Sequence, residues 1–149
     1  MRAVVQRVKS ASVTVESEII SSISKGFLVL LGVETGDTES DIEYMVKKIV
    51  GLRVFEDADE KMNLSIEDIK GEIIIVSQFT LAGDARKGRR PSFSNAMEPD
   101  NANKMYMQVV EKIRQLGIKV GTGQFGADMD VAIVNSGPVT ILLDSHRNF

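Results

Sequence analysis

The run Ile73–Val76, in which every residue is β-branched, is the feature that most constrains how this chain folds. Branching at Cβ suits the extended backbone of a sheet, and such a run is typical of a central strand. We expect this strand over Glu72–Phe79, directly after a glycine. It leads into the polar and aromatic segment Ser77–Leu81. The sequence therefore predicts a sheet whose central strand ends in side chains that are able to take part in chemistry.

The residues before this strand predict further strands in an antiparallel arrangement. Residues 1–9 combine valines with polar side chains and indicate an opening strand. Over Ala11–Val15 apolar and polar residues alternate with a period of two, which predicts a half-buried strand with Glu18–Ile23 paired back on it. The turn signal Lys25-Gly26 then precedes Phe27–Val33, which indicates a buried strand. We expect these strands to form an antiparallel meander.

Two segments have the spacing of apolar residues that predicts a helix with one apolar face. Thr38 and Asp41 can form a capping box, and the apolar stripe after them runs to Gly51. The second helix is expected to begin at Pro99, a residue suited to a first helical position, and to end at Gly117. Between the elements we expect a short apolar piece at Leu52–Phe55, a loop at Glu56–Lys61, one helical turn at Ser65–Ile69 and a long loop over residues 82–98.

Two apolar runs, Met129–Val134 and Val139–Leu143, close the chain. The segment Asn135–Thr140 contains a Gly-Pro pair, and we expect two strands joined by a tight turn that proline makes rigid. Upstream, Ile118–Val120 predicts a short strand, followed by a flexible glycine-rich loop. No repeat or linker divides residues 1–149. We therefore predict one α+β domain: curved, mostly antiparallel, barrel-like β-sheets with two principal helices packed against them.

The composition excludes several kinds of chemistry. The chain has no cysteine, so a disulfide framework and a thiolate site are impossible, and its one histidine is His146, so a histidine-rich metal site is excluded. We expect neither a metal nor a cofactor. The longest apolar run begins at Phe27 and is too short to cross a membrane, and no signal segment is apparent, so we expect a cytoplasmic protein. A net charge of −3 argues against general binding of DNA or other nucleic acid, although a local basic patch can exist.

The segment Ser77–Leu81 is the first candidate site. Strand ends that hold polar groups over an apolar floor are common places for sites. Ser77 and Thr80 offer hydroxyls, Gln78 offers a donor and an acceptor, and the backbone N–H groups can line an oxyanion hole. Alternatively, the hydroxyls are satisfied locally at an ordinary strand end. The residues of this segment alone leave both interpretations open.

A basic loop is the second candidate. Arg86, Lys87, Arg89 and Arg90 place four cations in five positions around a glycine. Such a cluster suits contacts with phosphate groups, and Phe93 nearby is able to stack on a base. The alternative is a solvated loop. Four cations in an otherwise acidic chain favour an anionic partner.

Three further patterns do not predict a site. Gly121–Gly126 matches G-x-G-x-x-G, but it does not open a helix, so we reject a dinucleotide site. Asp128 and Asp130 face the same side of a strand without a histidine or third carboxylate nearby, and we expect a solvated pair. His146 follows Asp144 by two positions close to the last residue, and we expect a surface histidine.

The segments Ser77–Leu81 and Asn135–Thr140, taken together, resemble the paired signature motifs of the D-aminoacyl-tRNA deacylases. They occur in the family's order, about 55 residues apart. Ser136 is a departure, since the family usually has aspartate at this point. The resemblance covers essentially the whole chain, because it extends to Met1–Val8, Arg90–Phe93 and Gly126–Met129.

The resemblance implies a homodimeric hydrolase. It would cleave the ester between a D-amino acid and the terminal adenosine at the 3′ end of an aminoacyl-tRNA, releasing tRNA and the amino acid. The active site would form at the dimer interface, where Gly137 and Pro138, joined by a cis bond, reach into the pocket of the partner subunit. Their carbonyl oxygens would point at the α-amino group, so that an L side chain collides with the backbone and a D side chain points away. Achiral glycyl-tRNA is the expected second substrate.

For the catalytic step we expect little help from side chains. The backbone N–H near Phe79 is expected to stabilise the oxyanion, while Thr80 is either a nucleophile or an orienting group, since no obvious base is available to activate it. The family resemblance also suggests that the substrate's 2′-hydroxyl helps to activate water. Ser77 and Gln78 are expected to hold the adenosine, and Arg7 to brace the Gly-Pro loop. The four cations of the basic loop are expected to contact the tRNA backbone.

Two other hypotheses remain open from the sequence. The chain can be an RNA-binding module that uses the basic loop and Phe93 without turnover, or a dimeric scaffold with neither activity. A deacylation assay separates the enzyme from both.

Overall fold

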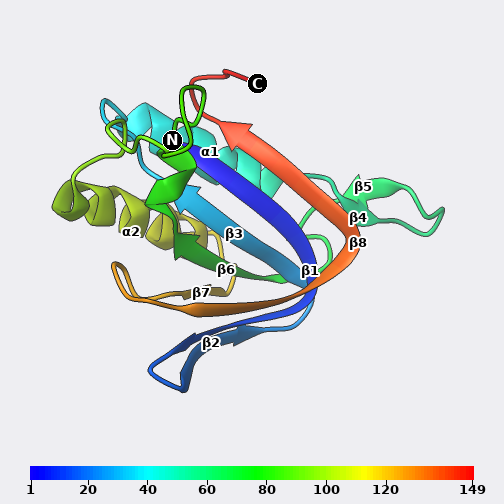
Figure 1. The fold of residues 1–149 in the computed structure, drawn as a ribbon. Coiled ribbons are helices and arrows are strands. Elements are labelled where there is room, and N and C mark those ends of the chain that lie inside the picture. Colours follow the sequence, from blue (N-terminus) through cyan, green and yellow to red (C-terminus); the bar gives the residue numbers. More distant parts are fainter.

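The computed structural model describes residues 1–149, and its sheet curves so strongly that it nearly closes into a barrel (Figure 1). Strand β2 (Glu18–Ile23) lies against β7 (Val120–Thr122), at the far side of the sheet. Two helices, α1 (Glu39–Gly51) and α2 (Pro99–Gln115), pack against the outside of the sheet. The predicted α+β class, with a barrel-like sheet and two principal helices, is confirmed.

Strand β1 (Arg2–Val15) organises the sheet, since it pairs with three other strands. The two opening strands of the prediction are this one continuous strand. Strand β8 (Asp130–Asp144) pairs with β1 along nearly the whole length of β1, so β2 and β3 (Gly26–Gly32) follow one another along the other edge of β1. The predicted meander is therefore wrong in its strand order. The chain bends between β2 and β3 instead of reversing there, because each pairs antiparallel with a different half of β1.

The predicted central strand is present as β6 (Glu72–Ser77), and its residues Ile73–Val76 are buried. It pairs in parallel with β3 and β7, because α1 and α2 form the crossovers between these strands. The strand ends before Phe79, earlier than predicted, because the chain turns there into the 3₁₀ helix η1 (Phe79–Ala82). The change from apolar to polar residues after Val76 thus coincides with the end of the strand.

The helices begin where their caps predict. The capping box of α1 is formed: the N–H of Thr38 donates to Asp41 at 2.7 Å. Helix α2 begins at Pro99, and the side chain of Glu98 accepts hydrogen bonds from two free N–H groups of its first turn. The apolar faces of both helices join the sheet in the main core, which includes Ile42, Met45, Ile49, Tyr106, Val109, Ile113, Phe27, Ile73 and Ile75.

The shorter elements differ in detail from the prediction. β4 (Phe55–Glu56) and β5 (Met62–Leu64) form a small hairpin that projects from the barrel, with the predicted loop between them. The strand predicted at Ile118–Val120 forms two residues later as β7. Gly121 is therefore in the sheet, not in a flexible loop; any Cβ there would meet the hydroxyl of Ser21 on β2.

The largest correction concerns the end of the chain. The two predicted strands and their tight turn are a single strand, β8 (Asp130–Asp144), because β1 is long enough to pair with both halves. Gln6 is paired with Thr140 and Val8 with Asn135, so the four residues 136–139 lie opposite the single residue Arg7. We call residues 136–139 the bulge. A bulge is one of the few places where a strand accommodates proline, which cannot donate to the ladder.

No helix of the protein combines the length and the apolar character that crossing a membrane requires.

Candidate active site

A cavity of about 630 Å³ opens at the C-terminal end of β6 and is lined mostly by apolar residues. One wall is the strand end Ser77–Phe79. The second wall is the segment Phe93–Pro99, which we call the strap, and the third is Phe125–Val131, which leads into β8. The size and lining are those of pockets that hold small organic groups. We call this cavity the pocket.

Strand β6 and helix η1 hold the first predicted motif at the pocket. The N–H of Gln78 donates to the carbonyl of Leu31 at 2.8 Å, which extends the pairing of β6 with β3 by one residue. Phe79 is the first residue of η1, so no carbonyl of that turn can accept its N–H. Its ring is 58% exposed and meets the ring of Phe93 edge to face, at 5.3 Å between centroids. Phe79, a residue of the pocket wall, therefore carries a backbone N–H that has no acceptor within its own turn.

Thr80 is exposed, and its hydroxyl contacts the side-chain amide of Gln78. An amide cannot take up a proton, so this contact does not activate the hydroxyl as a nucleophile. The lining carboxylates are Glu98 and Asp128, and Glu98 is already used as the cap of α2. Behind the pocket, Tyr106 donates to the carbonyl of Ile75 at 2.6 Å, and burial raises the pKa of this phenol.

The bulge is the second predicted motif. The Gly137-Pro138 bond is cis, and both residues are exposed. Arg7 lies behind them: its Nε donates to the carbonyl of Ser136 at 3.0 Å and its Nη1 to the carbonyl of Val54 at 2.7 Å. Gly137 has φ +122°, and a Cβ there would lie 2.9 Å from the Arg7 guanidinium. The position therefore requires glycine.

The structure of one chain does not bring the two motifs together. Neither Gly137 nor Pro138 lines the pocket. The pocket ends at Val131, and the six residues from there to Gly137 span about 20 Å of extended strand. Gly137 and Pro138 are instead exposed on the surface, outside the pocket of their own chain.

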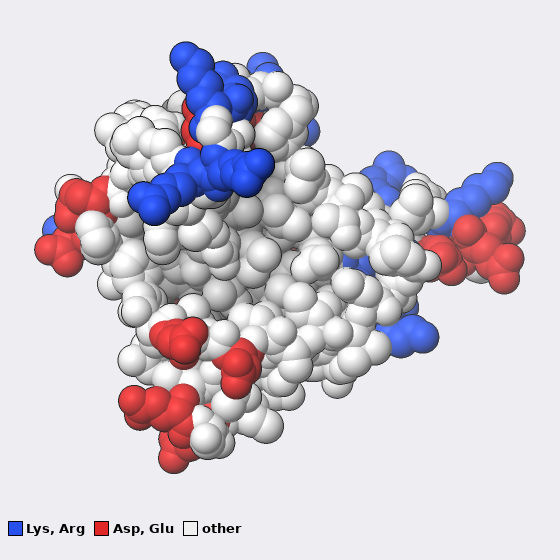
Figure 2. Space-filling model, in the orientation of Figure 1, with Lys and Arg blue, Asp and Glu red and all other residues white.

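The basic loop stands at the pocket rim, where Figure 2 shows lysine and arginine gathered above a hollowed, uncharged surface. Backbone hydrogen bonds in both directions between Asp84 and Ser92 close the loop at its base. Arg86 pairs with Asp84 at 2.7 Å, and its hydrogen bonds hold the pKa of this carboxyl well below its usual range. The other three cations, Lys87, Arg89 and Arg90, are exposed and make no ion pair.

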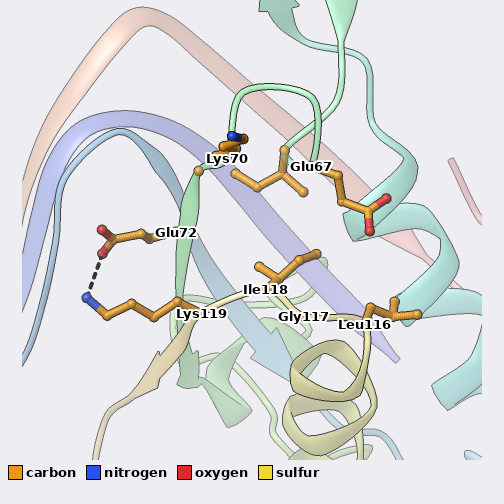
Figure 3. A pocket seen from close by; sticks show the side chains of 9 residues that line it. Glu67, Lys70, Glu72, Leu116, Gly117, Ile118 and Lys119 are labelled. Atoms are coloured by element: carbon orange, nitrogen blue, oxygen red, sulfur yellow. Dashed lines mark hydrogen bonds and ion pairs between the residues drawn. The ribbon is translucent and has the colours of Figure 1, made fainter.

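A different cavity, of about 430 Å³, lies at the opposite end of β6 (Figure 3). Its lining charges are partly paired with each other, since Lys119 meets Glu72 at 3.2 Å. None of the predicted site residues lines it. We therefore place the candidate active site at the other end of the strand.

His146 is exposed, as predicted, and its ring is also hydrogen-bonded. Its Nε2 lies 2.9 Å from Asp37, with Asp41 at 3.8 Å. The three side chains have the spacing of metal ligands. Asp37, however, already accepts a hydrogen bond from the α-ammonium group of Met1 at 2.6 Å, so a cation occupies this carboxylate. Asp128 and Asp130 are exposed, as expected.

Comparison with solved structures finds the same fold in two other proteins. A protein titled c-Myc DNA Unwinding Element Binding Protein superposes with a TM-score of 0.91 at 47% identity, covering 97% of this chain and 98% of that one. A probable eukaryotic D-amino acid tRNA deacylase superposes with a TM-score of 0.82 at 17% identity, covering 95% and 97%, a likeness that shows the fold alone.

Comparison of sequences identifies the family. The family model described as D-Tyr-tRNA(Tyr) deacylase matches residues 4–144. The D-aminoacyl-tRNA deacylase of Clostridioides difficile is 59% identical over the full length of both chains, and that of Myxococcus xanthus is 62% identical, covering 97% of this chain and 95% of its own. The chain therefore belongs to the D-Tyr-tRNA(Tyr) deacylase family, and it is a hydrolase.

Sequence analysis missed part of the pocket. Met97, Ala102 and Phe125 line it, yet they carry no polar group that would mark them as site residues. The segment Gly126–Met129 was connected with the family only through the resemblance, and it forms part of the third wall. Apolar lining residues follow the same periodicity as core residues, so only the fold distinguishes them.

Proposed function

We propose that this protein hydrolyses the ester bond of D-aminoacyl-tRNA, releasing the D-amino acid and free tRNA in the cytoplasm. One observation carries the proposal: in a chain of this family, the Phe79 N–H stands without a partner from its own turn at the wall of an apolar pocket. Ester hydrolysis passes through a tetrahedral oxyanion, which such a donor stabilises by hydrogen bonding.

In this proposal side chains do little of the chemistry. The Phe79 N–H stabilises the oxyanion, and Ser77 and Gln78 hold the terminal adenosine against the apolar walls. Thr80 orients Gln78, which agrees with the contact between their side chains. Water is the nucleophile, activated by the substrate's own 2′-hydroxyl. No cofactor or metal takes part.

In this proposal the bulge of a partner subunit selects D-aminoacyl over L-aminoacyl substrates. Both enantiomers carry the same side chain, so selection has to come from rejecting one direction in space. A rigid backbone wall does this for any side chain, and Gly137-Pro138 offers such a wall. Its outward-facing position and its distance from the pocket of its own chain fit insertion into a second copy. Glycyl-tRNA has no side chain to reject and is the second substrate.

A homodimer supplies this arrangement. The face shown in Figure 2 is largely free of charge between the basic loop and an acidic group at its lower left. On β8, Val134 and Leu142 are more than half exposed, on either side of the bulge. Two-fold symmetry makes both subunits contribute the same surface, so each pocket receives one bulge. The basic loop at the rim contacts the phosphates of the acceptor end.

A deacylation assay tests the proposal. Purified protein is given D-tyrosyl-tRNA, L-tyrosyl-tRNA and glycyl-tRNA at equal concentration, with spontaneous hydrolysis subtracted. We expect rapid release from the D and glycyl substrates and none above background from the L substrate. Equal rates on both enantiomers would overturn the chiral filter, and binding of tRNA without turnover would overturn the enzyme.

A further inference from the structure

Arg2, the first residue of β1, is half-buried and contacts the turn η1 that follows β6. Its Nη1 donates to the carbonyl of Leu81 at 3.0 Å. Its Nε lies 3.4 Å from a carboxylate oxygen of Glu34 and 3.6 Å from one of Asp144. Both carboxylates are buried, and the Nε is itself closed off from solvent without a hydrogen bond of its own. The guanidinium is thus held in one place by two buried negative charges.

The carbonyl that Arg2 binds belongs to the last full turn of η1. Within that turn, Leu81 donates to Gln78 and Gly83 donates to Thr80, so the carbonyl of Leu81 has no donor in the turn. Carbonyls at the end of a helical turn need an outside donor, and Arg2 supplies it. The same short turn begins with Phe79, so Arg2 holds the far end of the element that carries the proposed oxyanion donor.

The turn also rests directly on the sheet. A Cβ at Gly32 would lie 2.8 Å from the carbonyl oxygen of Gln78 and 3.0 Å from the Cβ of Leu81. This close contact fixes the start of η1 against β3, and the Arg2 hydrogen bond holds the carbonyl at its other end.

Glu34 connects the same cation to the opposite wall. Its carboxylate accepts from the side-chain amide of Asn95 at 2.9 Å, and its backbone bridges to Ala96. The adjoining N–H of Thr35 donates to the carbonyl of Asn95 at 2.8 Å. These contacts tie the strap to the end of β3. The wall that carries Phe79 therefore contacts Arg2, the wall that carries Phe93 contacts Glu34, and these two side chains form an ion pair.

We propose that Arg2 is a positioning residue for the hydrolytic reaction: it sets the direction of the Phe79 N–H by holding η1 against the Glu34-anchored strap. The inference rests on the proposed function, because it assigns Arg2 to the donor of that reaction. Arg2 touches no substrate and acts only through Leu81 and Glu34. Its planar fork contacts a carbonyl and two carboxylates at once, which the single ammonium of lysine cannot reproduce.

The test compares Arg2→Lys with the matched variant Arg53→Lys. Arg53 also donates to a backbone carbonyl, that of Asn63 at 2.9 Å, but in the β4–β5 hairpin away from the pocket. For Arg2→Lys we expect kcat on D-tyrosyl-tRNA to fall about tenfold with KM nearly unchanged, because a displaced donor weakens the transition state and not substrate binding. Arg53→Lys is expected to match the unchanged protein.

Amide hydrogen exchange supplies a readout that does not depend on activity. In Arg2→Lys the amides of Thr80–Gly83 are expected to exchange about tenfold faster, while those of Ile73–Val76 keep their protection. Unchanged exchange in η1, or a loss of kcat that only follows a general loss of folded protein, would overturn the positioning role. If the unaltered protein hydrolyses no D-aminoacyl-tRNA, the proposed function fails, whereas the exchange result still reports whether Arg2 holds the turn.

Discussion

The pocket and the bulge differ in what they present and in what holds them. The pocket is concave, and three segments of one chain complete its walls, with the Phe79 N–H at its edge. The bulge is exposed at Gly137 and Pro138, which offer backbone carbonyl groups and no polar side chain. Arg2 supports the first region, and Arg7 supports the second through the carbonyl of Ser136.

Under the proposed function, this difference separates the rate of the reaction from its selectivity. A backbone N–H stabilises the oxyanion of either enantiomer equally well, because the oxyanion carries no information about the side chain. A rigid wall discriminates by shape but contributes nothing to the bond that breaks. Damage to the pocket should therefore slow all substrates together, whereas damage to the bulge should change the ratio between D and L substrates.

The largest effect is expected from Phe79→Pro. Proline removes the N–H and is tolerated at the first position of a helical turn. Loss of one oxyanion donor lowers kcat by about 10²–10³. Phe79→Ala is the control, since it removes the ring but keeps the N–H. Steady-state rates on D-tyrosyl-tRNA and glycyl-tRNA should fall together in Phe79→Pro. Equal rates in Phe79→Pro and Phe79→Ala would show that the N–H takes no part in catalysis.

The next largest effect is expected from Gly137→Ala. Alanine at φ +122° is strained by about 1–3 kcal/mol, and its methyl group would also press on the Arg7 guanidinium. We expect the D rate to fall about tenfold and the preference for D over L to shrink. Gly51→Ala is the control, because a Cβ there meets no atom within 4 Å. An unchanged D-to-L ratio in Gly137→Ala would contradict the wall.

Mixing Phe79→Pro with Gly137→Ala tests whether the bulge acts on the pocket of its own subunit or on that of the partner. In a mixed dimer, one subunit has an intact pocket and the other an intact bulge. If the bulge acts across the interface, random exchange of subunits restores about one quarter of full activity. If it acts within one chain, mixing restores nothing.

The two regions also differ in how far the sequence predicted them. The β-branched run Ile73–Val76 and the capping box at Thr38 and Asp41 are local signals, and both elements formed as expected. The prediction of a site at Ser77–Thr80 rested on its place at a strand end, and Ser77–Phe79 do line the pocket. The bulge was predicted as a tight turn, because a Gly-Pro pair between two apolar runs carries a turn signal. Only the long partner β1 keeps the chain extended there, and this pairing links residues far apart in the sequence.

Residues that act through contacts distant in sequence were also beyond prediction. Arg2 belongs to an ordinary strand pattern, and its contact with Leu81 depends on the folding of η1 onto β3. The pocket's apolar wall residues, such as Phe125, were likewise indistinguishable from core. The family resemblance identified the motifs, but the resemblance by itself contains no distances.

A smaller effect, on binding rather than on rate, is expected from the basic loop. Arg89→Ala with Arg90→Ala removes two exposed cations that have no partner in the chain. We expect KM for aminoacyl-tRNA to rise several-fold at moderate salt and kcat to stay unchanged. The slope of log affinity against log salt should flatten by about one for each phosphate that the loop no longer neutralises. Lys61→Ala, in the distant β4–β5 hairpin, is the control. An unchanged salt slope would show that this loop does not contact tRNA phosphates.

The smallest effect is expected from Thr80→Ala. If the hydroxyl only orients Gln78, the rate on D-tyrosyl-tRNA should stay within about threefold, the scale of one modest hydrogen bond. Thr80→Val serves as the matched variant, because it keeps the branched shape and removes only the hydroxyl. A nucleophilic Thr80 would instead make both variants nearly inactive and would let a covalent acyl-enzyme accumulate in the unchanged protein, detectable as a burst of released tRNA. Because the only contact of this hydroxyl in the chain is with an amide, we expect no burst, and the pocket then works mainly through its backbone, as the bulge does.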